Sequence, residues 1–248
     1  MPEQVQAYDR IGRGYGKRRR SDPRIAELIQ GALKGAASVL NVGAGAGSYE
    51  PWQTKLVAVE PSWEMIRQRP DGASPAVRAL AQELPFSDKS FEVSMAILTV
   101  HHWTDPAQGL RELMRVSRQR VVIYTWDPHF SDFWLTRDYF PELEQIHLEM
   151  FPALEEFQNV LGAITIKKVS IPHDCTDGFL GAYWRRPQAY LDPKLRAAMS
   201  AFSKTKHELE GVEALRRDLS SGVWDKRNAE LLGLASLDLG YRLIIKKL

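Results

Sequence analysis

Short apolar runs alternate with helical patterns over most of this chain. The runs that predict strands cover residues 39–42, 56–59, 76–80, 91–100, 120–125, 164–169 and 241–245. Between several of them, apolar residues recur at helical spacing after good helix starts such as Asp22-Pro23 and Asp105-Pro106. Strands that alternate with helices are typical of an α/β protein with a mostly parallel sheet.

The first predicted strand ends in three alternating glycines, Gly43, Gly45 and Gly47. Glycine adopts positive φ at little cost and has no Cβ, so such a loop can turn sharply and approach a ligand closely. A strand followed by a glycine loop and then a helix is typical of the nucleotide crevice of an open sheet. The second strand ends at Glu60, whose carboxylate can accept two hydrogen bonds from a ribose diol. The sequence therefore predicts a nucleoside site here, with a helix after the loop.

The spacing of these glycines separates two families of nucleoside-binding proteins. Dinucleotide-binding oxidoreductases use G-x-G-x-x-G, and Ser48 occupies the position of their third glycine, which argues against NAD(P). The loop instead resembles the E/D-x-G-x-G-x-G loop of class I S-adenosylmethionine-dependent methyltransferases. It is most similar to their small-molecule, ubiquinone/menaquinone-biosynthesis-like branch, methyltransferase type 11, with Asn41 at the acidic position. The resemblance implies a Rossmann-like, doubly wound α/β sheet, mostly parallel with an antiparallel last strand, plus a helical cap.

Other segments resemble the same family. Residues 60–65 match its acid-Pro-Ser-x-x-Met segment, and residues 81–92 match its Ala-Glu-x-Leu-Pro-Phe-x-Asp-x-Ser-Phe-Asp segment. Tyr15 and Arg19 match a Tyr-x-x-x-Arg pattern, although a solvated basic arm is the alternative there. The resemblance implies S-adenosyl-L-methionine as cofactor, S-adenosyl-L-homocysteine as product, and the following cofactor residues: Tyr15, Arg19, Asn41, Gly43, Ala44, Gly45, Gly47, Glu60, Pro61, Met65, Ala81, Gln82 and Leu98.

His102 follows the predicted central strand, whose end faces the cofactor methyl group in the resembled architecture. A histidine of near-neutral pKa can take a proton from an acceptor, so His102 is the candidate catalytic residue. The alternative is a histidine that only caps the strand or bonds to backbone. No Cys, His or acidic cluster at ligand spacing accompanies it, so we expect no metal site.

The second half of the chain leaves the shared core of the family. We expect one domain over residues 1–248, with a cofactor-binding core at 1–127, helical lid excursions at about 128–162 and 172–235, and final strands at 163–171 and 240–248. Aromatic walls with a few polar groups suit a small-molecule pocket. The candidate acceptor-binding residues are Trp126, Trp134, Asp174, Tyr183, Trp184 and Arg185, with ordinary helix packing as the alternative.

Composition narrows the class further. A chain of 248 residues with 44% hydrophobic content can bury a full core. The formal net charge of +2 is too small to argue for a nucleic-acid partner. A single cysteine excludes an intrachain disulfide, and the absence of long apolar stretches favours a cytoplasmic protein without a membrane span. We therefore expect a methyltransferase acting on a small-molecule acceptor. A non-enzymatic cofactor-binding or interaction protein is the alternative.

Overall fold

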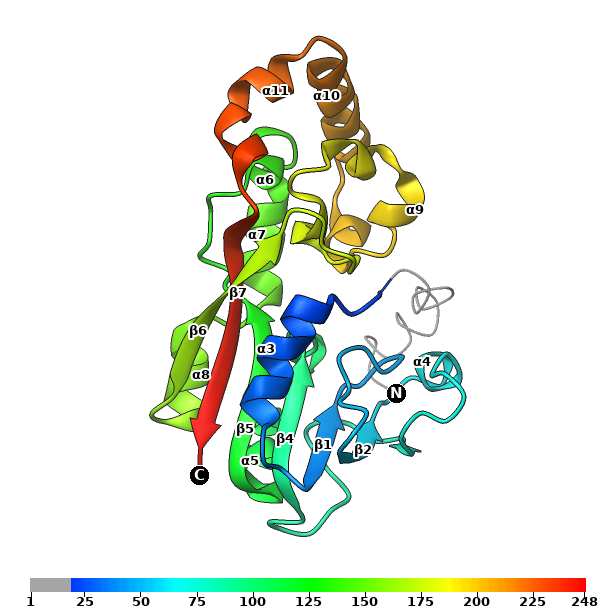
Figure 1. Ribbon diagram of the computed structural model, residues 1–248, viewed down its shortest axis with the longest axis vertical. Coiled ribbons are helices and arrows are strands. Elements are labelled where there is room, and N and C mark those ends of the chain that lie inside the picture. Colours follow the sequence, from blue (N-terminus) through cyan, green and yellow to red (C-terminus); the bar gives the residue numbers. More distant parts are fainter. Residues whose placement is uncertain (1–18) are drawn as a thin grey trace.

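The sheet has seven strands in the order β3-β2-β1-β4-β5-β7-β6, and helices lie on both of its faces (Figure 1). The computed structural model describes residues 19–248, so Tyr15 of the predicted cofactor set lies outside the described residues. The strands are β1 Ser38–Val42, β2 Lys55–Val59, β3 Ala76–Val77, β4 Phe91–Ile97, β5 Ser117–Trp126, β6 Thr165–Pro172 and β7 Ser236–Lys247. Strands β1 to β5 pair in parallel, and β7 is antiparallel to both of its neighbours, β5 and β6. The predicted sheet is confirmed.

Helices cover the sheet and continue above it. They are α3 Pro23–Leu33, α4 Trp63–Arg67, α5 Pro106–Val116, α6 Trp134–Asp138, α7 Glu142–Met150, α8 Leu154–Leu161, α9 Pro193–Arg196, α10 Glu208–Ser220 and α11 Val223–Arg227, with 3₁₀ helices at Val100–His102, Leu180–Tyr183, Pro187–Leu191, Ser200–Lys204 and Ala229–Gly233. Two of the predicted helix starts are confirmed. The Asp22 side chain accepts a hydrogen bond from the Arg24 N–H, and Asp105 accepts one from the Gln108 N–H.

Side chains of the central strands alternate between two hydrophobic cores. Val39 and Val122 pack on the face covered by α3, whereas Leu40 and Val121 pack on the face covered by α5 and α8. This period of two follows from the pleat of a strand. Because both faces are covered, the central strands read as continuous apolar runs in the sequence.

The predicted helix after the glycine loop is absent. Residues 43–54 form turns that lead directly into β2. The backbone alternates in hand there, because Gly43, Gly45, Gly47 and Tyr49 all have positive φ, between 53° and 93°. A right-handed helix cannot contain such residues. The loop therefore keeps its backbone N–H groups for local and site contacts.

Two predicted strands end earlier than expected. The third ends at Val77, so residues 78–80 leave the sheet, and Ala79 and Leu80 line the cavity described below. The central strand β4 ends at Ile97 because Leu98 has a φ of 48°. The chain then turns into the 3₁₀ helix that carries His101 and His102.

The helices of the second half form a cap above the carboxyl ends of the strands, at the top of Figure 1. α6, α7, α9, α10 and α11 lie there, and the ring of Trp134 on α6 lies 5.1 Å from that of Trp224 on α11. Helix α8 is different, because it packs against α5 on the sheet. The stretch from residue 128 therefore does not lie wholly above the strand ends.

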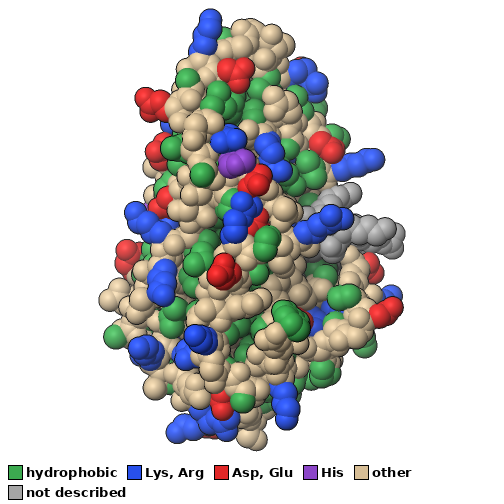
Figure 2. Space-filling view, viewed as in Figure 1, with side chains coloured by type: hydrophobic (Ala, Val, Ile, Leu, Met, Phe, Trp, Pro, Cys, Tyr) green, Lys and Arg blue, Asp and Glu red, His purple; other side chains and the backbone are tan. Residues whose placement is uncertain are grey.

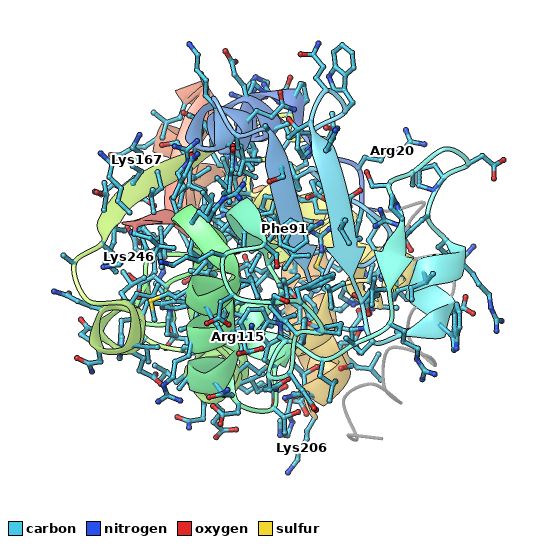
Figure 3. The ribbon with its side chains drawn as sticks, turned by 90° about the horizontal axis from the view of Figure 1, so that it is seen from below. Arg20, Phe91, Arg115, Lys167, Lys206 and Lys246 are labelled. Carbon is cyan, nitrogen blue, oxygen red and sulfur yellow. The ribbon has the colours of Figure 1, made fainter. Side chains whose placement is uncertain are left out.

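Charged residues are spread over the surface. On the face seen in Figure 2, Lys and Arg side chains are interspersed with Asp, Glu and hydrophobic ones, without a continuous basic stripe. Seen from below in Figure 3, Lys167 and Lys246 lie at the β6–β7 edge, while Phe91 lies inside the molecule. Within residues 19–248, no helix is long and apolar enough to cross a membrane.

Candidate active site

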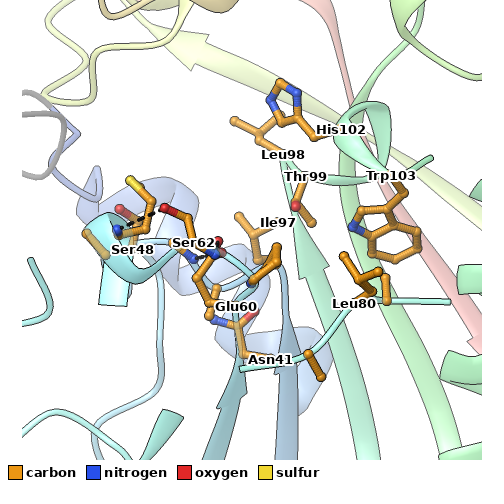
Figure 4. Close-up of a pocket in the computed structure, with 18 of the residues that line it drawn as sticks. Asn41, Ser48, Glu60, Ser62, Leu80, Ile97, Leu98, Thr99, His102 and Trp103 are labelled. Atoms are coloured by element: carbon orange, nitrogen blue, oxygen red, sulfur yellow. Dashed lines mark hydrogen bonds between the residues drawn. The ribbon is translucent and has the colours of Figure 1, made fainter. Parts of the chain in front are cut away.

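A cavity opens at the carboxyl ends of β1, β2 and β4, where the glycine loop turns away from the sheet (Figure 4). It brings together most of the predicted cofactor residues. Those that line it are Arg19, Asn41, Gly43, Ala44, Gly45, Glu60, Pro61, Met65, Ala81, Gln82 and Leu98, together with His102. Gly47 does not line it, and a Cβ at that position would meet Arg69 at 3.3 Å. The local motifs thus converge on one place, which we call the loop cavity.

Glu60 fixes the shape of the glycine loop. One carboxylate oxygen accepts a hydrogen bond from the Gly45 N–H at 2.8 Å, and the other accepts one from the Ser62 N–H at 2.9 Å. Gly43 lies against the end of β4, where an added Cβ would overlap the Thr99 side chain. The close approach of backbone segments explains why this position requires glycine.

Asn41 stands where the resembled family has an acid, and its side chain lies beside a carboxylate from the glycine loop. Its Nδ2 donates to Glu50 at 2.9 Å, and Arg69 donates to both oxygens of the Glu50 carboxylate at 2.9 and 2.8 Å. Glu50 is therefore the carboxylate next to Asn41, and the buried guanidinium of Arg69 pairs with it. The Oδ1 of Asn41 is buried and has no hydrogen-bond partner among the described residues. A lone acceptor in a cavity wall suits a ligand that brings a donor.

Residues 79–82 form another wall of the loop cavity, and side chains of helix α5 hold the chain that follows them. Glu112 accepts a hydrogen bond from the Leu84 N–H at 2.8 Å, and Arg115 donates to the carbonyl oxygens of Leu84 and Phe86. The hydrogen bond from Arg115 lowers the pKa of Glu112 below its usual range. Glu112 and Arg115 of this Glu-x-x-Arg motif therefore fix the backbone that follows residues 79–82.

A buried ionic network joins the loop to the cap. Asp177 in the cap has no exposed side-chain surface, and it accepts hydrogen bonds from Arg19 at 2.7 and 3.2 Å. The hydroxyl of Tyr49, at the end of the glycine loop, donates to the same carboxylate at 2.8 Å. Arg19 lines the loop cavity, so Asp177 links the cap both to this cavity residue and to Tyr49 of the glycine loop.

A second cavity, of about 70 Å³, adjoins the first. Both cavities are lined by Arg19, Leu98 and His102, so they meet at the end of β4. The remaining lining residues of this aromatic cavity are His101, Trp126, His147, Phe151, Phe179, Leu180, Ala198, Met199, Ser200, Ala201 and Tyr241. The rings of His101 and Phe151 stack with centroids 4.0 Å apart, and those of Trp126 and His147 lie 4.5 Å apart.

The surroundings of His102 do not suit a general base. Burial, with Lys204 and Arg19 nearby, lowers the pKa of His102 to about 3. The side chain is therefore neutral at physiological pH and binds a proton weakly. Its place where the cavities meet suits hydrogen bonding and shape rather than proton removal.

The predicted acceptor residues separate into three groups. Trp126 lines the aromatic cavity. Trp134 and Trp184 are buried in the cap, where their indole N–H groups donate to backbone carbonyls, and half-buried Tyr183 stacks under the Arg186 guanidinium instead. Near the surface, Asp174 accepts a hydrogen bond from Arg24, and Arg185 donates one to the Leu234 carbonyl. The structure brings none of these last five to the cavity.

Sequence reasoning missed His147, Phe151, Phe179 and Tyr241 of the aromatic cavity. They come from α7, from the loops of the cap and from β7, and no short motif links them. The only local signal is the density of aromatic residues near position 151. Among the described residues, no group of three His, Cys, Asp or Glu side chains could hold a metal ion.

The strand order, with an antiparallel β7 between β5 and β6, and a cavity at the glycine loop define the class I methyltransferase fold. Residues 40–125 match the family described as methyltransferase domain. A putative methyltransferase from an antibiotic biosynthesis pathway of Anabaena variabilis ATCC 29413 is 31% identical, with a TM-score of 0.84 over 93% of this chain and 99% of that chain. The chain therefore belongs to the S-adenosylmethionine-dependent methyltransferase family.

Curated relatives are more distant. An uncharacterized methyltransferase, YcgJ of Bacillus subtilis, is 28% identical over 137 residues, which is 51% of this chain and 47% of that protein. The 2-methyl-6-phytyl-1,4-hydroquinone methyltransferase 2 of Oryza sativa is 31% identical over 77 residues, or 31% of this chain and 21% of that protein. The chain thus spans about half the length of the first of these relatives, and less of the second.

Proposed function

We propose that this protein transfers the methyl group of S-adenosylmethionine to a small-molecule acceptor. The observation that carries the proposal is the meeting of two cavities at Arg19, Leu98 and His102. One cavity has the strand, loop and acid of a nucleoside site, and the other has the aromatic walls of a small-molecule site. A reaction between two bound molecules needs this kind of junction.

The residues of the loop cavity fit the cofactor. Glu60 is held at a strand end where its carboxylate can face a ribose diol, and Met65 lies beside Gly45. Asn41 offers a buried oxygen that accepts from the amino group of a methionine moiety. Ala81 and Gln82 are the candidate contacts to adenine, and Arg19 is the candidate contact to the carboxylate. Tyr15 stays a prediction because it lies outside the described residues.

Positioning accounts for catalysis in this proposal. A bound S-adenosylmethionine would supply a methyl group to a lone pair of the acceptor, with a neutral thioether as the leaving group, and the proton of the acceptor would be lost to solvent when the product is released. The protein places the acceptor in line and excludes solvent, and good orientation alone supplies roughly 7–11 kcal/mol of barrier reduction. His102 serves here as a positioning residue, since its lowered pKa opposes proton removal.

The relatives support a small acceptor without identifying it. The name of the Oryza sativa relative gives a hydroquinone as what that protein methylates, and the Anabaena variabilis protein is assigned to an antibiotic pathway. Both descriptions concern small molecules.

Cofactor binding by a glycine variant tests the proposal. Gly43→Ala places a Cβ against Thr99 at a residue whose φ is 71°, so we expect the affinity for S-adenosylhomocysteine to fall at least tenfold in calorimetric titration. Gly31→Ala is the matched control, because its Cβ meets nothing within 4 Å on α3 and its affinity should not change. Wild-type protein that bound NADH in preference to S-adenosylhomocysteine would contradict the proposal.

A further inference from the structure

A lysine of the cap lies beside the aromatic cavity. Ser200 and Ala201, at the start of the 3₁₀ helix Ser200–Lys204, both line this cavity. In a 3₁₀ helix the side chains at positions i and i+3 eclipse each other, so Lys204 lies over Ala201 on the side of the helix that faces the cavity. Lys204 itself is exposed. Its ammonium group is therefore within reach of both solvent and the cavity.

Lys204 has no ion-pair partner among the described residues. Carboxylates on the neighbouring helices are engaged elsewhere. Glu142 on α7 accepts two hydrogen bonds from backbone N–H groups, and Glu208 on α10 pairs with Arg196. An ammonium group that no protein carboxylate neutralises can form a charge-assisted hydrogen bond with an anionic group of a ligand.

The net charge at the aromatic cavity comes from Lys204. Arg19 also lines this cavity, but its guanidinium is paired with the buried carboxylate of Asp177 at 2.7 Å. No carboxylate of residues 19–248 lines the cavity. Burial and, after it, the positive charge of Lys204 lower the pKa of His102 to about 3. The potential of this lysine therefore extends to the place where the two cavities meet, and it favours an anion there.

Ser200 adds a second hydrogen-bond donor on the same helix. It is half-buried, and its hydroxyl makes no hydrogen bond within the part of the chain that the structure describes. Other polar side chains of the cavity wall are engaged, since Trp126 donates to a backbone carbonyl and Tyr241 accepts from a backbone N–H. A carboxylate has two oxygens that accept hydrogen bonds, which matches one hydroxyl and one ammonium donor.

Much of the remaining wall is apolar. Phe151, Phe179, Leu180 and Met199 line it, and Phe151 packs edge-on against Trp126 with ring centroids 5.4 Å apart. Apolar surface of this kind binds the hydrocarbon part of a small molecule. The cavity and the helix Ser200–Lys204 together therefore suit a molecule with an apolar body and one anionic end.

We propose that the methyl acceptor is an apolar small molecule that carries a carboxylate, with its apolar part in the aromatic cavity and its carboxylate bound by Lys204 and Ser200. This inference rests on the proposed function, which assigns the adjoining loop cavity to the cofactor. It adds a charge to the description of the substrate and makes Lys204 a residue that determines specificity.

A pair of isosteric probes tests the preference for a carboxylate. The full chain is saturated with S-adenosylhomocysteine and titrated at pH 7 with naphthylacetate and with naphthylacetamide, which differ in charge but hardly in shape. We expect the carboxylate to bind about tenfold more tightly than the amide. Equal binding of the two probes, or no binding of either, would overturn the inference and leave cofactor binding intact. Failure of S-adenosylhomocysteine itself to bind would instead overturn the proposed function.

Variants of the lysine test its role. Lys204→Met keeps an unbranched side chain of similar length and removes the charge, so the Kd of naphthylacetate should rise about tenfold, and Lys204→Arg should retain most of the affinity. The Kd values of naphthylacetamide and of S-adenosylhomocysteine should not change, which also shows that the variants are folded. Lys206→Met, at an exposed lysine two residues further on (Figure 3), is the matched control. Equal losses in the two Met variants, or an unchanged Kd in Lys204→Met, would contradict recognition by Lys204.

Discussion

Two non-glycine residues at the site have positive φ, Tyr49 at 64° and Leu98 at 48°. Such conformations cost free energy and persist only where tertiary contacts hold them. Tyr49 is held by its hydrogen bond to Asp177, and Leu98 by a backbone hydrogen bond to Tyr124 at 2.7 Å. The strain at Leu98 lies where the two cavities meet, which fits a residue that shapes the contact between methyl donor and acceptor.

Asn41 leads to the first prediction. Replacing it with the acidic residue of the family pattern should destabilise this protein. Asn41→Asp would place a second carboxylate beside Glu50, in place of the 2.9 Å hydrogen bond from Nδ2. We expect the free energy of unfolding at pH 7 to fall by about 1–3 kcal/mol, measured by urea denaturation. The exposed change Asn159→Asp on α8 should cost less than about 0.5 kcal/mol. A stabilised Asn41→Asp variant would contradict the role given to Glu50 and Arg69.

At the scale of elements, the cap is tied to the core by ion pairs of unequal burial. The Arg19–Asp177 pair has side-chain exposures of 10% and 0%, whereas the Arg24–Asp174 pair has 47% and 57%. Breaking a buried pair leaves an uncompensated charge, while an exposed pair contributes little. Only the first pair should therefore hold the cap segment over the loop.

Two neighbouring substitutions separate these pairs. Asp177→Asn should lower the free energy of unfolding by roughly 2–4 kcal/mol and raise the KM for the cofactor, because Arg19 and Tyr49 lose their shared partner. Asp174→Asn should change the free energy of unfolding by less than about 1 kcal/mol. Similar effects of both changes, in denaturation and steady-state kinetics, would contradict a link between cap and loop.

The sequence predicts those parts of the site that are held together by neighbouring strands of the sheet. The glycine loop and Glu60 follow adjacent parallel strands, so their strand positions alone place them together. The missing helix after the loop was not predictable from the glycine spacing, because the positive φ of Tyr49 depends on its distant partner Asp177. The aromatic cavity combines His101, His147 and Tyr241, whose proximity depends on how the cap packs.

On the scale of the whole molecule, burial of neutral histidines makes stability depend on pH. The pKa of His147 is lowered by burial to about 4, and the pKa values of His101 and His102 are lowered as well. Below a pH of about 6.5 the unfolded chain binds protons at these residues, whereas the folded protein does not. The free energy of unfolding should therefore decrease as the pH falls from about 6.5 toward 4.

Denaturation at two pH values measures this effect. Between pH 7.5 and pH 5, His147 should account for a loss of roughly 1–2 kcal/mol of unfolding free energy. In His147→Phe that part of the loss should disappear, while exposed His129→Phe should keep the wild-type dependence. An unchanged pH dependence in His147→Phe would show that the imidazole is not held neutral in the fold.

The central claim is that the loop cavity holds S-adenosylmethionine with its methyl group facing the aromatic cavity. A crystal structure of the complex with S-adenosylhomocysteine tests it most directly. We predict the ribose at Glu60, adenine at residues 79–82, and the sulfur beside Leu98, where the two cavities meet. A complex with the nucleoside bound elsewhere, or with its sulfur directed away from the aromatic cavity, would contradict the account.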